Sequence, residues 1–172
     1  MTATHASPHD VERAATGQPA AGARPGRPAV HALDTEQSRA LLARNRVGRI
    51  AFAVSGRVDI EPIHYVYHDG WIFGRTSPGT KAAAVRHNPW VAFEVDEIEG
   101  AFDWRSVVVH GTLYFLEEDG PPSAAATRER AITLLRRLVP DLGTPFDPVA
   151  FRSLVFGIHV TTYTGRSSQN DA

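Results

Sequence analysis

A cluster of seven residues, Arg75 to Lys81, carries the side chains best suited to bind an anion. It combines two cations with two turn formers and with three hydroxyls, those of Thr76, Ser77 and Thr80. An apolar, aromatic run at 71–73 precedes it, and an alanine-rich stretch follows at 82–86. We therefore expect the cluster on a loop between a strand end and a helix N-terminus. The unpaired N–H groups of a helix N-terminus, together with a lysine, an arginine and hydroxyls, suit a phosphate.

Lys81 strengthens this interpretation because it is the single lysine in a chain with 18 Lys and Arg residues. A compact ammonium suits a phosphate in a tight loop better than a planar guanidinium does. No complete phosphate-loop motif is present. The alternative is that Thr80 and Lys81 are simply a polar helix start.

Composition excludes several classes of protein. The formal net charge of -1 argues against nucleic-acid binding, which requires a basic excess. The absence of cysteine excludes disulfides, thiol nucleophiles and thiolate metal sites. The histidines are scattered without metal-ligand spacing, so we expect neither a metal nor a histidine-ligated haem. No apolar run reaches the roughly 20 residues of a membrane helix, and no signal-peptide core is visible, so we expect no membrane contact and a cytoplasmic location.

The chain divides into three parts by composition. Residues 1–30 are dominated by Ala, Gly and Pro and are predicted to be a disordered tail, because they bury too little apolar surface to offset their ordering entropy. Residues 31–166 are predicted to form one folded domain, with order beginning near Leu33. Residues 167–172 are predicted to be a disordered C-terminus.

Local patterns predict mostly strands. A helix is expected over 35–45, with Asp34 and Gln37 at capping-box spacing. Strands are expected over 47–54, 58–67 and 71–75, with an Asp69-Gly70 hairpin turn between the last two. After a short helix ended by Asn88-Pro89, a strand is expected over 90–96, an acidic loop over 97–103 and a strand over 104–116. A helix over 124–139 and a strand over 153–163 complete the order.

This order predicts a mainly β fold with flanking helices, in the α+β class. The strands follow one another as antiparallel hairpin neighbours, which argues against a doubly wound fold. About six strands in one sheet favour closure into a small barrel, because closure removes the exposed edges.

In the order and spacing of several short segments, the chain resembles the pyridoxamine 5'-phosphate oxidase-like family of flavin-binding split barrels. Within that family it is similar to the actinobacterial branch with nitroimidazole-reductase-like relatives. The resemblance runs from Leu33 to Arg166. Its segments are Val47-Gly48-Arg49-Ile50-Ala51-Phe52, Glu61-Pro62-Ile63-His64-Tyr65-Val66-Tyr67, Arg75-Thr76-Ser77-Pro78-Gly79-Thr80-Lys81, Val91-Ala92-Phe93-Glu94-Val95-Asp96, Trp104-Arg105-Ser106-Val107-Val108-Val109-His110-Gly111 and Gly165-Arg166.

The resemblance implies a six-stranded antiparallel split β-barrel that forms a homodimer, with flavin mononucleotide (FMN) in a groove at the interface. It implies three sets of cofactor-binding residues. The phosphate ligands would be Arg75, Thr76, Ser77, Thr80 and Lys81. The strand along the flavin ring would be Pro62, Ile63, His64 and Tyr65. Arg105 and Ser106 would lie near the flavin.

The chain also departs from the family pattern. The true oxidases place an arginine for the phosphate on the second strand, where this chain offers Ile60 or Glu61, and a glutamine where it has Ser106. Their C-terminal segment for pyridoxal phosphate is not evident, so vitamin B6 oxidation is not implied. His64 is the candidate catalytic residue, and it could orient a substrate, donate to a flavin carbonyl or transfer a proton. A purely structural histidine is the alternative.

Three functions remain open. The chain is expected to be an FMN-dependent oxidoreductase acting on a small organic substrate, in which the cofactor supplies the redox chemistry. The alternatives are a flavin store or sensor without turnover, and a reductase of the same fold that uses a deazaflavin.

Overall fold

A computed structural model describes residues 29–169 of the chain. The predictions for residues 1–28 and 170–172 concern positions outside the described residues. The elements are, in order, β1 (Ala29–Leu33), α1 (Thr35–Arg44), β2 (Val47–Val54), β3 (Arg57–His68), β4 (Trp71–Thr76), α2 (Thr80–His87), β5 (Trp90–Gly100), β6 (Asp103–Phe115), α3 (Pro122–Leu135) and β7 (Leu154–Gln169).

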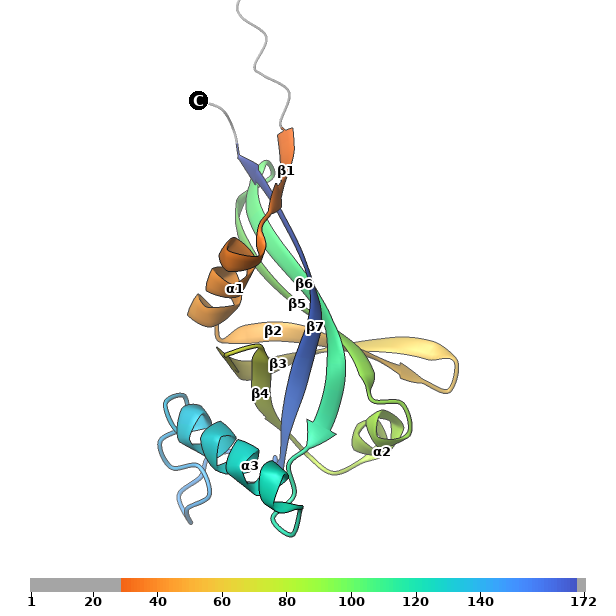
Figure 1. The fold of residues 1–172 in the computed structure, drawn as a ribbon, viewed down its shortest axis with the longest axis vertical. Helices are drawn as coiled ribbons and strands as arrows, with labels where there is room; N and C mark the ends of the chain where they lie inside the picture. The colour runs from red at the N-terminus through yellow and green to blue at the C-terminus, as the bar shows by residue number, and fades with distance from the viewer. Residues whose placement is uncertain (1–28, 170–172) are drawn as a thin grey trace, which may run out of the picture.

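Six of the strands close into a ring. The sheet order is β1-β7-β4-β3-β2-β5-β6, and β6 also pairs with β7. Every pairing is antiparallel, and β1 adds to β7 outside the ring. Figure 1 shows the long strands β5, β6 and β7 running together while β2 and β3 cross them. The predicted mainly β barrel with flanking helices is confirmed.

Two apolar clusters hold this arrangement together. The larger one fills the barrel and includes Tyr65, Phe93 and Phe156, and the other lies between α3 and the outer face of β3, β4 and β7. Close packing explains one glycine: a Cβ at Gly48 would lie 2.2 Å from Cζ of Phe93. A larger residue at position 48 would therefore displace the central ring of the barrel.

The capping box and the hairpin turn predicted from the sequence are both present in the structure. Asp34 Oδ1 accepts from the Gln37 N–H at 2.7 Å, and Gln37 Oε1 accepts from the Asp34 N–H at 2.9 Å, which completes the capping box. Asp69 and Gly70 both have positive φ, 49° and 77°, as a two-residue hairpin of this type requires.

Some predicted boundaries were wrong. The acidic stretch 97–103 is not a loop: β5 continues to Gly100 and β6 begins at Asp103. Arginines face the first carboxylate of this stretch. Glu97 pairs across the sheet with Arg105 and forms an ion pair with Arg44 at 2.6 Å. The last strand was predicted to end at 163, but β7 continues to Gln169.

The folded part of the chain was predicted to begin near Leu33, but the first strand begins at Ala29. Residues 29–33 and 165–169 pair through their backbones. The side chains of 29–33 are mostly exposed, and the buried residues of 165–169 are Gly165, Ser167 and Ser168, so neither segment shows an apolar pattern. The first helix ends at Arg44, one residue early. The helix predicted over 124–139 ends at Leu135, and tighter i→i+3 hydrogen bonds continue to Leu138.

Candidate functional site

The predicted arrangement of strand, polar loop and helix is present at residues 75–81. β4 ends at Thr76 and α2 begins at Thr80. The residue that caps α2 is Gly79, and no side chain in the described part of the chain caps this helix. Its first N–H groups are therefore available to an anion, and Thr80 lies exposed beside them.

Thr76 and Lys81 come together at one end of the barrel. They line a small cavity of about 20 Å³ together with Ile63 of β3 and residues of α2, and the Thr76 residue is only 8% exposed. Lys81 Nζ donates a hydrogen bond to Glu61 Oε2, which makes an ion pair between α2 and β3. Ser77 is half-buried in the same loop. The loop thus gathers hydroxyls, free N–H groups and one ammonium, although that ammonium already has a carboxylate partner.

Arg75 lies on the opposite face of β4 from Thr76, because successive side chains of a strand alternate. Its guanidinium bonds to both carboxylate oxygens of Asp147, at 2.6 and 3.1 Å, and to the Val149 carbonyl at 3.1 Å. The two side chains are 9% and 2% exposed. The structure therefore does not bring Arg75 into the group formed by Thr76 and Lys81.

The bond from Arg75 also lowers the pKa of Asp147 well below its usual range. The backbone N–H groups of Gly143 and Val149, which donate to the same carboxylate at 3.1 and 3.0 Å, act in the same direction. Asp147 is thus held as an anion that fixes the segment between α3 and β7 against β4.

β3 has an open backbone edge beside the polar loop. Residues 57–64 pair with β2, and only 65–68 pair with β4. No other described strand pairs with 57–64. This edge contains Pro62, Ile63 and His64, which the family resemblance implies would lie along a flavin ring. Its unpaired N–H and C=O groups are suited to bind a polar ligand edge.

The side chains along this edge alternate between the two faces of the sheet. Ile63 and Tyr65 are buried in the barrel, whereas Pro62 and His64 are exposed. The Tyr65 hydroxyl donates to the Leu42 carbonyl at 2.7 Å, and burial raises the pKa of Tyr65 above its usual value. The side chain of Tyr65 therefore holds α1 against the barrel. Its backbone N–H donates to the Arg46 carbonyl at 3.0 Å and the residue pairs with Gly74 of β4, so the structure does not place Tyr65 on the open edge.

His64 and Arg75 both line a larger cavity between the outer face of the sheet and α3. We call it the α3 cavity, and its volume is about 320 Å³. Its lining residues are His64, Arg75, Leu135, Leu138, Val139, Leu142, Pro148, Val149 and Arg152.

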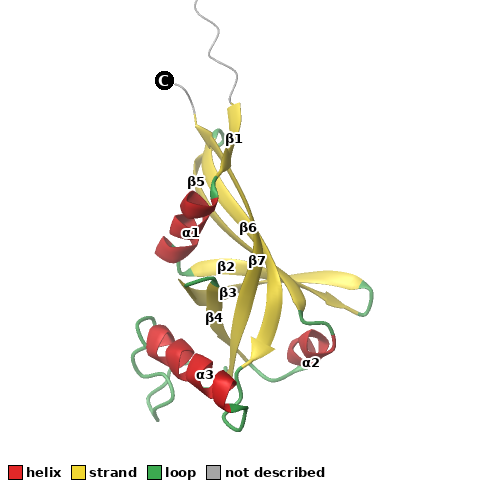
Figure 2. Ribbon diagram, viewed as in Figure 1, coloured by secondary structure: helices red, strands yellow, loops and turns green. Residues whose placement is uncertain are grey.

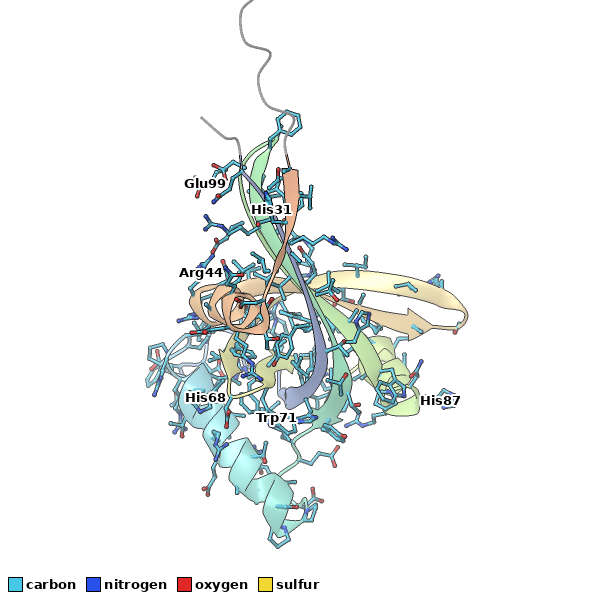
Figure 3. The ribbon with its side chains drawn as sticks, turned by 45° about the horizontal axis from the view of Figure 1, so that its top comes forward. His31, Arg44, His68, Trp71, His87 and Glu99 are labelled. Carbon is cyan, nitrogen blue, oxygen red and sulfur yellow. The ribbon has the colours of Figure 1, made fainter. Side chains whose placement is uncertain are left out.

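Arg105 and Ser106 lie elsewhere in the molecule. They are near the start of β6, opposite Glu97 and Asp96 of β5. Arg105 lines a separate hollow under α1 with Arg44 and Gln37. Figure 3 labels Glu99, near the end of β5, at the upper left and His87, at the end of α2, lower down on the right, well apart from each other. A single chain therefore does not bring Arg105 and Ser106 to Lys81.

Sequence reasoning missed three residues that the structure places at these sites. Glu61 was noted only as a departure from the family pattern, and its ion pair with Lys81 was not expected. Asp147 and Arg152 lie in a turn-rich segment whose sequence gives no sign of its contacts. Glu61 could have been identified by considering acidic as well as basic residues beside the expected phosphate loop.

The described residues contain no group of three or more His, Asp or Glu side chains arranged to hold a metal ion. No helix within residues 29–169 is long and apolar enough to cross a membrane.

Comparisons with known proteins give one family and a consistent fold. The chain is similar to a crystal structure of an FAD-binding protein from Mesorhizobium loti, with 27% identity and a TM-score of 0.67 over 83% of this chain and 98% of that one. An FAD-binding protein from Mycobacterium smegmatis has 25% identity and a TM-score of 0.57 over 80% and 98%.

A putative 5-nitroimidazole antibiotic resistance protein from Bacteroides thetaiotaomicron shares the fold, with 14% identity and a TM-score of 0.63 over 84% of this chain and 91% of that one. An uncharacterized protein of Rhizobium meliloti is 28% identical over 82 residues, which is 48% of this chain. This match spans about half, 54%, of that curated relative.

The family described as pyridoxamine 5'-phosphate oxidase matches residues 34–167, nearly the whole described part of the chain. This range contains the polar loop, the open edge of β3 and the α3 cavity. The chain belongs to the pyridoxamine 5'-phosphate oxidase family.

Proposed function

We propose that this protein binds a flavin nucleotide and acts as an oxidoreductase on a small organic substrate. The observation that carries the proposal is the open edge of β3 at residues 57–64, which lies beside a loop with free helix N–H groups and the single lysine. Family membership and two similar structures described as FAD-binding proteins support it.

The phosphate of the flavin would bind at the N-terminus of α2. The N–H groups of the first turn, the hydroxyls of Thr76 and Ser77 and the ammonium of Lys81 supply the donors that a phosphate requires. Lys81 would exchange its bond with Glu61 for a bond to the phosphate. One lysine matches one terminal phosphate, so we propose FMN as the cofactor, and FAD is the alternative that the names of the two relatives support.

The flavin ring would lie along Pro62, Ile63 and His64. The unpaired backbone groups of this edge match the polar edge of the ring, and the exposed Pro62 and His64 side chains flank it. The flavin supplies the redox chemistry, and the chain supplies binding, orientation and exclusion of water.

We further propose that the functional unit is a homodimer. Large apolar side chains are exposed on neighbouring strands of the barrel: Val47 at 51%, Val58 at 68%, Ile60 at 64% and Trp90 at 64%. We call these four residues the barrel patch. Figure 2 shows the turn end of the β2–β3 hairpin projecting sideways from the barrel. Val58 and Ile60 belong to the β3 strand of this hairpin, and Val47 begins its β2 strand.

Pairing of identical patches about a two-fold axis is the usual way to cover such a surface. A second copy would also supply its own Arg105 and Ser106, which one chain alone holds away from Lys81. The dimer would thus complete the set of cofactor contacts that the family resemblance implies.

The test is the absorbance spectrum of the protein mixed with FMN or FAD and separated from free cofactor, followed by anaerobic addition of reduced nicotinamide. We expect a retained flavin spectrum that is bleached by the reductant. Retention without bleaching by any reduced nicotinamide supports a flavin store. Absence of retained flavin contradicts the proposal, and retention of a deazaflavin in its place supports a deazaflavin-dependent reductase.

A further inference from the structure

We propose that the α3 cavity binds a small apolar molecule that carries a carboxylate, with Arg152 as the residue that recognises the anionic group. The proposal that such a molecule binds rests on the cavity and its lining residues alone. The further step, that this ligand is the substrate, rests on the proposed flavin function.

The size and lining of the cavity suit a small organic molecule. Its volume of about 320 Å³ lies at the lower end of the range for small-molecule sites, which begins near 300 Å³. Leu135, Leu138, Val139, Leu142 and Pro148 give it an apolar wall. An apolar ligand that displaces water from this wall gains the free energy of burying that surface.

The charges in the cavity favour an anion. Arg75 is neutralised by Asp147 and by the Val149 carbonyl. Among residues 29–169, no carboxylate lies within ion-pair distance of Arg152, and its guanidinium carbon lies 5.7 Å from the centroid of the Phe151 ring. Arg152 therefore brings an uncompensated positive charge to an otherwise apolar wall, where a carboxylate is the natural complement.

The cavity also adjoins the open edge of β3. His64 belongs to that edge and lines the cavity, so it is shared by both places. A molecule in the α3 cavity would lie next to a ring bound along Pro62–His64. This placement makes His64 the residue between cofactor and substrate, consistent with its candidacy as an orienting or proton-carrying group.

The ion pair of Arg75 with Asp147 supports the cavity structurally. It anchors the segment that carries Pro148, Val149 and Arg152 to β4. This pair is buried and bonded on several sides, and the Arg152 N–H donates to the Val149 carbonyl at 2.9 Å, so the backbone that carries Arg152 is anchored.

The test uses 4-phenylbutyrate and its neutral amide, 4-phenylbutyramide, titrated by calorimetry into the full-length, flavin-free protein. We expect the carboxylate to bind more tightly than the amide, by roughly three- to tenfold. Arg152→Gln should weaken carboxylate binding to the level of the amide without changing the amide. Arg130→Gln, an exposed α3 position that does not line the cavity, is the matched control and should keep the difference.

A second variant tests the location. Leu138→Trp places a larger side chain in the cavity wall and should abolish binding of both probes, with an unchanged circular dichroism spectrum as the check on folding. Equal affinities of wild type for acid and amide, or a difference that survives Arg152→Gln, would overturn the proposal. So would loss of probe binding after loading with FMN or FAD, because the cavity would then belong to the flavin site. Flavin binding is measured separately by fluorescence quenching, so a failure of the flavin proposal leaves the probe titrations interpretable.

Discussion

Lys81 of α2 and Glu61 of β3 form an ion pair at the end of the barrel. The pair has two opposed effects on a phosphate at the α2 N-terminus. It holds the ammonium near the site, but it also places a negative charge beside it. Replacing each partner in turn separates these effects.

Replacing the lysine tests the phosphate site. Lys81→Ala removes a charge-assisted contact of about 1.5–3 kcal/mol, so FMN should bind roughly ten- to a hundredfold more weakly. Lys81→Arg should recover only part of the loss, because a planar guanidinium needs a different geometry. Fluorescence quenching titrations give the dissociation constants.

Riboflavin is the control for the lysine variants, because it lacks the phosphate. It should bind wild type and Lys81→Ala about equally, which separates a phosphate contact from general damage. Equal FMN affinities for wild type and Lys81→Ala would exclude Lys81 as a phosphate ligand.

Replacing the glutamate tests its competition with the phosphate. Glu61→Gln removes a nearby negative charge and frees Lys81, so FMN should bind on the order of tenfold more tightly. FAD should gain less, since each of its phosphates carries one charge and the phosphomonoester of FMN carries nearly two. The same titrations with both cofactors measure the ratio. Weaker FMN binding by Glu61→Gln would show that the carboxylate helps position Lys81.

The buried Arg75–Asp147 pair should make stability depend on pH. Asp147→Asn leaves the Arg75 charge without its partner, and we expect the melting temperature at pH 7 to fall by several degrees. Because the folded-state pKa of Asp147 is lowered, the pair stabilises the fold above the unfolded pKa of about 4 and loses this effect as pH falls below it. The gap between wild type and variant should therefore narrow from pH 7 to pH 3 in thermal melts. A gap that does not change with pH would contradict an ionic role.

The barrel patch should control association. Ile60→Lys places a charge in the centre of the proposed interface and should convert a dimer to a monomer in light scattering. Phe146→Lys is the matched control, because Phe146 is 80% exposed but lies between α3 and β7, away from the patch. A monomer mass for flavin-loaded wild type would contradict the dimer proposal. A dimer mass for the Ile60→Lys variant would show that the interface lies outside the barrel patch.

The β1 strand should set the limit for trimming the N-terminus. A chain that starts at Pro28 keeps every β1–β7 pair, so its melting temperature should match the full chain. A chain that starts at Asp34 loses those backbone hydrogen bonds and the Leu33 side chain, which packs on the core, and should melt a few degrees lower. Equal melting temperatures for both would show that β1 adds no stability.

The sequence was sufficient for elements with strong local chemistry. The Asp34 and Gln37 side chains define where α1 begins, and Asp69-Gly70 defines a hairpin, because each signal acts within four residues. The polar loop followed from the same kind of information, since a strand, turn formers and alanines adjoin it in the chain.

Contacts between residues that are far apart in the sequence were harder to predict. Arg75 was grouped with Thr76 because they are neighbours in sequence, whereas the alternation of a strand separates them and an aspartate 72 residues away takes the arginine. The stretch from Glu97 looked like a loop because Glu97 was counted without Arg44 and Arg105, which face it. The α3 cavity could not be predicted, because its walls come from three parts of the chain that only the fold brings together.

The position of β7 has a consequence for how the protein folds during synthesis. This strand pairs with β1, β4 and β6, so the ring stays open until residues 154–169 have left the ribosome. Until then β4 and β6 each lack a neighbour and offer an unpaired edge to other chains. Closure joins segments from both ends of the domain, which makes it a slow, non-local step. Premature stop codons before β7 should therefore yield aggregated rather than merely weakened protein.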